Sequence, residues 1–119
     1  IEEISKGIAL AHGAEAEIDF DLINKYPPTI NHKEQSEFAA NVAKKMVGDD
    51  KVITNINPSM GGEDFSYLLN EKPGSYLYIG QQDEKHKASL HTTKYDFNDN
   101  LLPIGVNYWV NLVKECFNK

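Results

Sequence analysis

The sequence contains four histidines, and the position of His91 sets it apart from the other three. It lies at the end of a long polar loop, just before the last apolar helix pattern. A neutral imidazole can bind a divalent metal ion, but a catalytic zinc ion needs about three protein ligands. The sequence has no HExxH motif, no CxxC motif and no tight cluster of Asp and His. Spacing alone therefore leaves two interpretations of His91: a surface histidine, or one ligand of a metal site.

A glycine pair, Gly61 and Gly62, precedes two acidic residues and a short apolar helix pattern. Backbone N–H groups exposed at such a helix start can hold a carboxylate or an oxyanion. The alternative is an ordinary helix-start turn in which Glu63 and Asp64 complement the positive end of the helix dipole. No Gly-x-Ser-x-Gly elbow and no phosphate-binding glycine loop occur, which argues against serine hydrolases and nucleotide-binding proteins.

The elements around these residues begin with a predicted helix over residues 1–12 and a predicted strand over 14–22. The helix shows a 3.6-residue apolar period and ends at Gly13, and the strand alternates apolar and acidic residues. No capping residue precedes Ile1, which favours a chain cut, although processing or tag removal would look the same. The stiff segment Tyr26-Pro27-Pro28-Thr29 follows, and we expect a domain boundary there.

Beyond the boundary the pattern alternates between helix and strand. Asn31 and Glu34 form a predicted capping box for an amphipathic helix that ends at Gly48. Strands are expected near 52–56 and 75–80, with a helix from Phe65 between them. A long final helix opens near Asp99. The order helix, strand, helix, strand, helix predicts an α/β fold.

The bulk composition excludes several classes of function. The chain has 119 residues, of which 40% are hydrophobic, and a net charge of -6 with no basic cluster, so a nucleic-acid partner is not expected. No apolar run is long enough to cross a membrane. Its single cysteine, Cys116, cannot close an internal disulfide, which is consistent with a reducing compartment and predicts a cytoplasmic location.

Several motifs occur together in a fixed order, and their combination resembles the C-terminal part of the amidohydrolase branch of metallopeptidase family M20. This branch includes hippurate hydrolases, N-acyl-amino-acid amidohydrolases and auxin-conjugate hydrolases. The resemblance covers essentially the whole chain. The motifs are Tyr26-Pro27-Pro28-Thr29 with Asn31, Met60-Gly61-Gly62-Glu63-Asp64-Phe65, Lys72-Pro73-Gly74, Ile79-Gly80, Leu90-His91, Tyr95-Asp96-Phe97 and Leu102-Pro103-Ile104-Gly105.

The resemblance implies a C-terminal fragment of a two-domain metallohydrolase. Residues 1–25 would end an α+β lid and dimerisation domain, and residues 26–119 would be the returning segment of the catalytic domain. His91 matches a histidine that binds one of two divalent ions, such as zinc, manganese, cobalt or nickel. Gly61 and Gly62 match a turn whose backbone lies beside the substrate. Glu63 and Asp64 belong to the same motif without an implied catalytic role.

The reaction that the resemblance implies is hydrolysis of the amide bond of an N-acyl amino acid or a similar small amide or peptide. The other metal ligands, the general-base glutamate and the lid histidine of the family have no match in this chain, so it supplies no catalytic residue. The implied partners are the N-terminal remainder of the same protein and a second copy in a homodimer. The isolated chain is expected to be inactive and to bind no metal stably.

Two rival interpretations do not involve catalysis by a larger enzyme. In the first, the chain is a non-catalytic binding or scaffolding module, and His91 is incidental. In the second, it is a stand-alone domain that shares only the tail of the fold. Turnover by the isolated chain, or restored turnover with an N-terminal portion, separates these alternatives.

Overall fold

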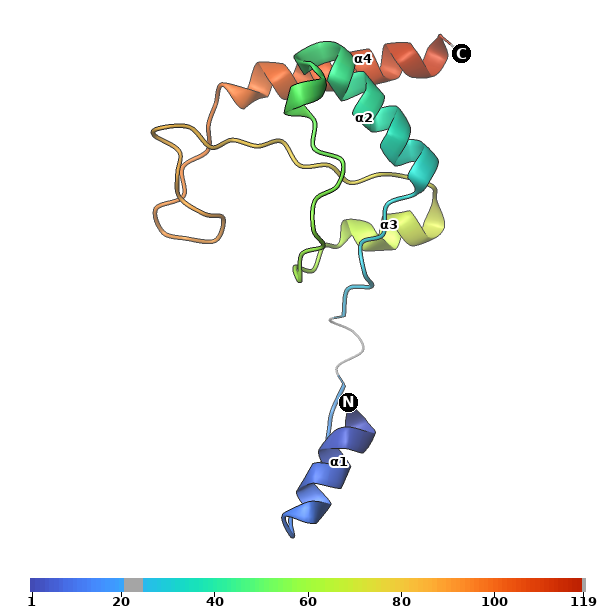
Figure 1. Cartoon of the computed structure of the whole chain (residues 1–119), viewed down its shortest axis with the longest axis vertical. Helices are drawn as coiled ribbons and strands as arrows, with labels where there is room; N and C mark the ends of the chain where they lie inside the picture. Colours follow the sequence, from blue (N-terminus) through green and yellow to red (C-terminus); the bar gives the residue numbers. More distant parts are fainter. Residues whose placement is uncertain (21–24, 119) are drawn as a thin grey trace.

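A computed structural model describes residues 1–20 and 25–118, and its regular structure is helical (Figure 1). The helices are α1 (Glu2–Ala11), α2 (Lys33–Val47), α3 (Phe65–Glu71) and α4 (Leu101–Phe117), and a 3-10 turn, η1 (Asp49–Lys51), follows α2. All four α-helices lie where the apolar periods predicted them. Gly13 has a φ of 68° just beyond α1, which is the left-handed conformation expected of a glycine after a helix end.

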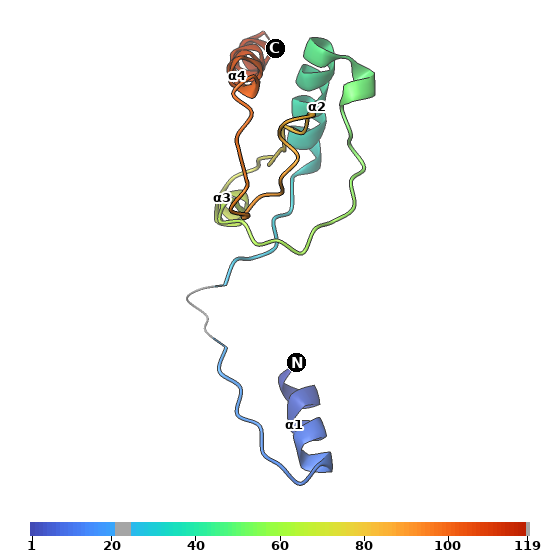
Figure 2. The same cartoon turned by 90° about the vertical axis from the view of Figure 1, so that its left-hand side faces the viewer.

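The main tertiary contact is the packing of α2 against α4, which Figure 2 shows with α4 nearly end-on beside α2. Three small side chains of α2, Ala39, Ala40 and Val42, are buried. Small residues on the contact face let two helices approach closely. The Tyr108 hydroxyl of α4 donates to the Ala39 carbonyl at 3.2 Å, and Lys45 forms an ion pair with Glu115 at 2.6 Å.

The start of α2 is tied to the segment after α3, and this corrects the predicted capping box. The N-cap residue is His32, and no side chain caps this helix end. The Asn31 amide instead pairs with the backbone of Tyr76: its Oδ1 accepts from the Tyr76 N–H at 2.7 Å, and its Nδ2 donates to the Tyr76 carbonyl at 2.9 Å. The prediction failed because a partner distant in sequence competes for the side chain that would otherwise cap α2.

The predicted α/β class is not confirmed by the described residues, which contain helices and no strands. Residues 14–20, 52–62 and 73–80 have no regular hydrogen-bonded structure, and Asp21 and Leu22 of the first predicted strand lie outside the described residues. A strand exists only as part of a ladder, in which its N–H and C=O groups bond to a neighbouring strand. The sequence pattern can favour strand conformation, but it cannot supply that neighbour.

The chain is elongated and exposes much apolar surface. Its radius of gyration is 20.2 Å, whereas a compact domain of this length has about 13.5 Å. Its accessible surface is 10444 Å², against about 6,500 Å² for a folded monomer of this size. Helix α4 has no buried residue, and Trp109 is 63% exposed. Apolar side chains that should drive folding are therefore left in water over a large area.

Candidate functional site

The glycine pair leads directly into α3, and its acidic neighbour is held by hydrogen bonds. The Tyr76 hydroxyl donates to Glu63 Oε2 at 2.9 Å, and the Phe65 N–H donates to Glu63 Oε1 at 3.4 Å. The Tyr76 hydrogen bond is the main cause that lowers the pKa of Glu63 below its ordinary value, and the same bond raises the pKa of Tyr76. Glu63 is therefore an ionised acceptor that joins the helix start to the extended segment after α3.

Tyr26 packs over the second glycine of the pair. A Cβ atom at Gly62 would lie 2.9 Å from Tyr26 Cδ2, which is closer than real contacts allow. The Tyr26 ring meets the Tyr67 ring edge-on at 6.1 Å between centroids, and the Tyr67 hydroxyl donates to the Lys25 carbonyl. The connector therefore docks on α3 and covers one side of the glycine turn, so Gly62 is required by packing.

The first glycine of the pair lies in open surroundings. A Cβ atom at Gly61 would meet only Ser59 Oγ, at the ordinary contact distance of 3.8 Å. Gly61 and the preceding Met60 are both exposed. The backbone at Gly61 is thus accessible to a ligand, whereas the need for glycine at position 62 has an explanation within this chain.

His91 lies at a turn in the long loop between residues 81 and 98, with its side chain exposed. Its φ of 60° is the one positive value among the described non-glycine residues. Such a conformation costs about 1–3 kcal/mol and persists only where neighbouring structure holds it, although histidine tolerates it better than most residues. Here the Thr92 hydroxyl donates to the Ser89 carbonyl at 2.9 Å, and the Tyr95 N–H donates to the Thr92 carbonyl at 3.1 Å.

Within the described part of the chain, the His91 imidazole makes no hydrogen bond or ion pair, so both ring nitrogens are open. The donor chemistry fits one ligand of a divalent ion. The described residues contain no group of three or more His, Cys, Asp or Glu that could hold an ion together. His91 therefore fits part of a metal site and needs ligands that the described residues do not place beside it.

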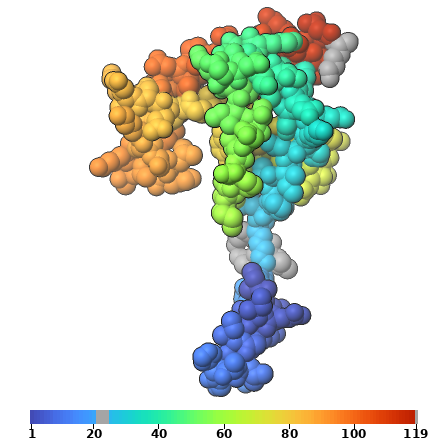
Figure 3. Space-filling model, viewed as in Figure 1, coloured from blue at the N-terminus to red at the C-terminus, as the bar shows by residue number. Residues whose placement is uncertain are grey.

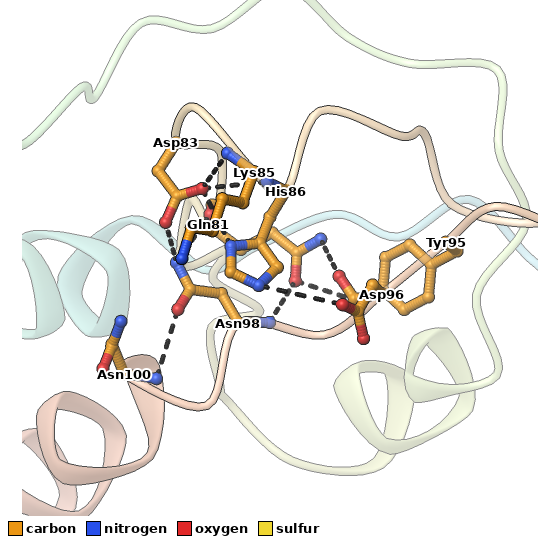
Figure 4. Close-up of polar contacts among 8 residues, drawn as sticks. All are labelled: Gln81, Asp83, Lys85, His86, Tyr95, Asp96, Asn98 and Asn100. Carbon is orange, nitrogen blue, oxygen red and sulfur yellow. Dashed lines mark hydrogen bonds and ion pairs between the residues drawn. The ribbon is translucent and has the colours of Figure 1, made fainter.

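A network of polar side chains closes the base of the His91 loop (Figure 4). At its centre is Asn98, which is only 6% exposed. Its side-chain Nδ2 donates to the Gln81 carbonyl at 3.1 Å and to Asp83 Oδ2 at 3.0 Å, and its Oδ1 accepts from the Asn100 N–H at 3.2 Å. These bonds join the first residues of the loop to its last.

Asp83 carries the most strongly perturbed carboxyl group of the loop base. Its Oδ1 accepts from the Lys85 and His86 N–H groups and contacts His86 Nδ1, each at 2.8 Å. The backbone N–H of His86, followed by that of Lys85, lowers the pKa of Asp83 to about 2 from its ordinary 3.8. These hydrogen bonds stabilise the ionised form and thereby the turn over residues 83–86.

The sign of this shift predicts an acid-labile turn. Because the folded pKa is the lower one, the stabilisation is present above pH 3.8 and is lost as the pH falls through about 2. We expect the Asp83 carboxyl carbon to titrate with a midpoint near 2 in an NMR titration, and the Lys85 and His86 amides to exchange faster as it protonates. Asp83→Asn is the control without a titrating group. A midpoint near 3.8 would contradict the hydrogen-bonded turn.

The structure does not bring the glycine turn and His91 together. The space-filling view shows the His91 loop, in gold and orange, as a lobe separated by a gap from the green segment that leads to the glycine pair (Figure 3). No hydrogen bond or ion pair links the two among the described residues.

Sequence reasoning also missed Tyr26, Tyr76 and Asn98 as residues that hold these segments. An Asp three residues before His86 was an available local signal for the turn at Asp83.

Comparison with known proteins places most of the chain in one family. Residues 3–115 match the family described as Peptidase family M20/M25/M40. Hippurate hydrolase of Campylobacter jejuni is 33% identical over 112 residues, which are 94% of this chain and 28% of that protein. IAA-amino acid hydrolase ILR1-like 4 of Arabidopsis thaliana is 32% identical over 90% of this chain and 25% of its own length.

A third relative, the putative amidohydrolase YhaA of Bacillus subtilis, is 35% identical over 83% of this chain and 25% of its own length. The chain thus spans between a quarter and a third of the length of these relatives. No solved structure matches the chain. None of the described helices has the length and apolar character needed to cross a membrane.

Proposed function

The chain belongs to peptidase family M20/M25/M40, as its match over residues 3–115 establishes, and from this premise we propose that it works as part of a larger metal-dependent amidohydrolase. This larger protein is the intact enzyme. Its substrates would be N-acyl amino acids or similar small amides and peptides, because the relatives are named hippurate hydrolase, IAA-amino acid hydrolase and amidohydrolase. The family match is the observation that carries this proposal.

The exposed apolar surface of the chain supports its assembly with further protein. Side chains of α4 and of the segments beside it line an apolar hollow of about 310 Å³. Its lining residues are Ile79, Phe97, Leu101, Leu102, Gly105, Val106 and Trp109. Burial of apolar area of this kind against a partner is favourable by roughly 25 cal/mol per Å². We propose that the N-terminal remainder of the same protein covers this face.

Within the intact enzyme, we assign His91 to metal binding and Gly61 and Gly62 to the turn beside the substrate. The bound divalent ions would supply an activated water and polarise the amide carbonyl. His91 would present a neutral imidazole nitrogen from the left-handed turn that orients it. The Gly61 backbone would approach the substrate, and Tyr26 would hold the turn from its other side. No residue of this chain is assigned as a catalytic acid or base.

Further features of the intact enzyme stay predictions that follow from the family resemblance. They are the presence of two ions, drawn from zinc, manganese, cobalt and nickel, and a homodimer formed through the lid domain. The division into residues 1–25 and 26–119 is a prediction of the same kind. The cytoplasmic location rests on the single cysteine, Cys116, which is exposed and free.

A reconstitution experiment tests the proposal. The isolated chain, incubated with Mn²⁺ or Zn²⁺ and benzoylglycine, should release no glycine above the buffer control, because His91 alone cannot hold an ion. Addition of the separately produced N-terminal remainder should restore hydrolysis, with a stable complex seen by size-exclusion chromatography.

Two outcomes would count against this assignment. Turnover by the isolated chain would contradict the proposal that it needs ligands from elsewhere. A complex that forms but hydrolyses none of a panel of N-acyl amino acids and dipeptides would favour the alternative of a non-catalytic binding or scaffolding module. A mixture that contains unrelated acidic protein in place of the remainder serves as the control for nonspecific metal effects.

A further inference from the structure

We propose that Asn98 is a positioning residue for the metal ligand His91, acting through a clasp that closes the loop between residues 81 and 98. The clasp is defined by Gln81, Asp83, Asn98 and Asn100 (Figure 4). This inference rests on the proposed function, since it takes His91 as a metal ligand. It adds a residue that does not touch the metal, seven positions along the chain from His91.

Asn98 uses every polar group of its side chain in the clasp. The Nδ2 group makes two donor bonds, to the Gln81 carbonyl and to Asp83 Oδ2, at 3.1 and 3.0 Å. The Oδ1 atom accepts from the Asn100 N–H at 3.2 Å. Asn100 is the N-cap residue of α4, so this bond joins the loop to that helix. The backbone N–H of Asn98 also donates to Gln81 Oε1 at 3.3 Å. Because Asn98 is only 6% exposed, water has little access to replace these hydrogen bonds if they are lost.

Further contacts extend from the clasp toward the tip of the loop. Gln81 Oε1 accepts from the Tyr95 hydroxyl at 3.2 Å, and its Nε2 donates to the Asp96 carbonyl at 3.4 Å. His86 lies between two carboxylates, with Nδ1 at 2.8 Å from Asp83 Oδ1 and Nε2 at 4.0 Å from Asp96 Oδ2. The arm before the His91 turn is therefore joined to the arm after it by several contacts at the base of the loop.

These hydrogen bonds at the base of the loop matter because the His91 turn has few contacts of its own. A loop of this length loses conformational entropy when its ends are held, and a left-handed histidine adds local strain. The clasp orders the loop before the metal binds. The free energy needed to order the loop and to hold the strained His91 backbone is then not subtracted from the binding free energy, so the affinity for the ion is higher. Supporting residues that fix a ligand's orientation typically change metal affinity by about 10–100-fold when they are mutated.

The test is Asn98→Asp in the intact enzyme, with Mn²⁺ or Zn²⁺ as the probe. The variant keeps the shape and the acceptor for the Asn100 N–H, but it replaces the Nδ2 donor with a carboxylate oxygen facing Asp83 and the Gln81 carbonyl. We expect the metal dissociation constant to rise by about 10–100-fold. The midpoint of thermal unfolding of the metal-free protein serves as the check that the fold persists.

The double variant Asp83→Asn and Asn98→Asp reverses the donor and the acceptor across the 3.0 Å contact. A positioning role predicts that it recovers part of the lost affinity, because the Asp83 contact is restored while the Gln81 carbonyl still faces a carboxylate oxygen. The unfolding midpoint of the metal-free protein, measured on both variants, separates this effect from a general loss of stability. The matched control is Asn70→Ala at an exposed position of α3, which should bind metal as the wild type does. An Asn98→Asp dissociation constant within twofold of wild type, or a loss of which the double variant recovers no part, would overturn the inference.

His91→Ala separates this inference from the function on which it rests. If His91→Ala loses the metal while Asn98→Asp keeps it, the clasp has no positioning role and the metal assignment stands. If His91→Ala retains the metal with wild-type affinity, the assignment of His91 itself is wrong, and the positioning role falls with it.

Discussion

His91→Ala in the intact enzyme should reduce both metal content and amide hydrolysis by at least about 100-fold, since mutation of residues that merely support a ligand already costs about 10–100-fold. The imidazole is exposed and makes no hydrogen bond within the described residues, so its removal breaks no internal contact there. Any loss of thermal stability in the metal-free enzyme should therefore come from the φ of 60°, which alanine tolerates less well than histidine. Metal analysis and a glycine-release assay measure the effect.

The matched control for this variant is His12→Ala, which removes another exposed histidine at the end of α1. It should retain metal and activity. Excess Mn²⁺ should recover part of the activity of His91→Ala if the defect is weakened binding, because occupancy rises with metal concentration. A His91→Ala enzyme with wild-type metal content and turnover would remove His91 from the site.

Gly62→Ala should lower kcat/KM by about 100-fold, because displacement of a substrate-positioning turn by about 1 Å can cost that much. The added Cβ would lie 2.9 Å from Tyr26 Cδ2, so either the Tyr26 ring or the turn must move. Overpacking in a core costs about 1–3 kcal/mol, and because Tyr26 is 55% exposed we expect a loss of stability at the lower end of that range. Urea unfolding and steady-state kinetics on N-acyl amino acids measure the two effects.

Two further variants separate packing from substrate contact. Gly62→Ala combined with Tyr26→Ala removes the clashing ring and should recover stability, apart from the lost contact between Tyr26 and Tyr67. Gly61→Ala adds a Cβ with room around it, so stability should hold, and any fall in kcat/KM then reports a close approach of the substrate. Wild-type kinetics in both glycine variants would contradict a role of this turn in substrate binding.

The helices were the most predictable part of the fold. The apolar periods placed α2 and α4 closely, and Gly13 and Gly48 both follow a helix end with positive φ. Helix hydrogen bonds join residues four apart, so the information that specifies them is local. The Asn31 capping box was the exception, because Tyr76, 45 residues away, takes the Asn31 side chain.

The candidate site was predictable in its residues and not in its arrangement. His91, Gly61 and Gly62 could be named from motifs, but their metal-binding and substrate-binding roles stay predictions. The residues that hold them in place, such as Tyr26 and Asn98, could not be predicted, because each acts on a segment far away in sequence. Tyr26 reaches the turn at Gly62 across 36 positions, and Asn98 reaches Gln81 across 17. Neither pair follows a spacing rule that a single sequence reveals.

The sequence by itself determined the helices and the ordered motifs that identify the family, since both depend on short stretches of chain. Only the tertiary structure decided that Asn98 closes the His91 loop and that Tyr26 covers Gly62. It also showed that the segments expected as strands have no ladder within the described residues. The physical reason is the same in each case: a helix satisfies its hydrogen bonds within itself, whereas a clasp, a ring contact or a strand needs a partner that folding must bring from elsewhere.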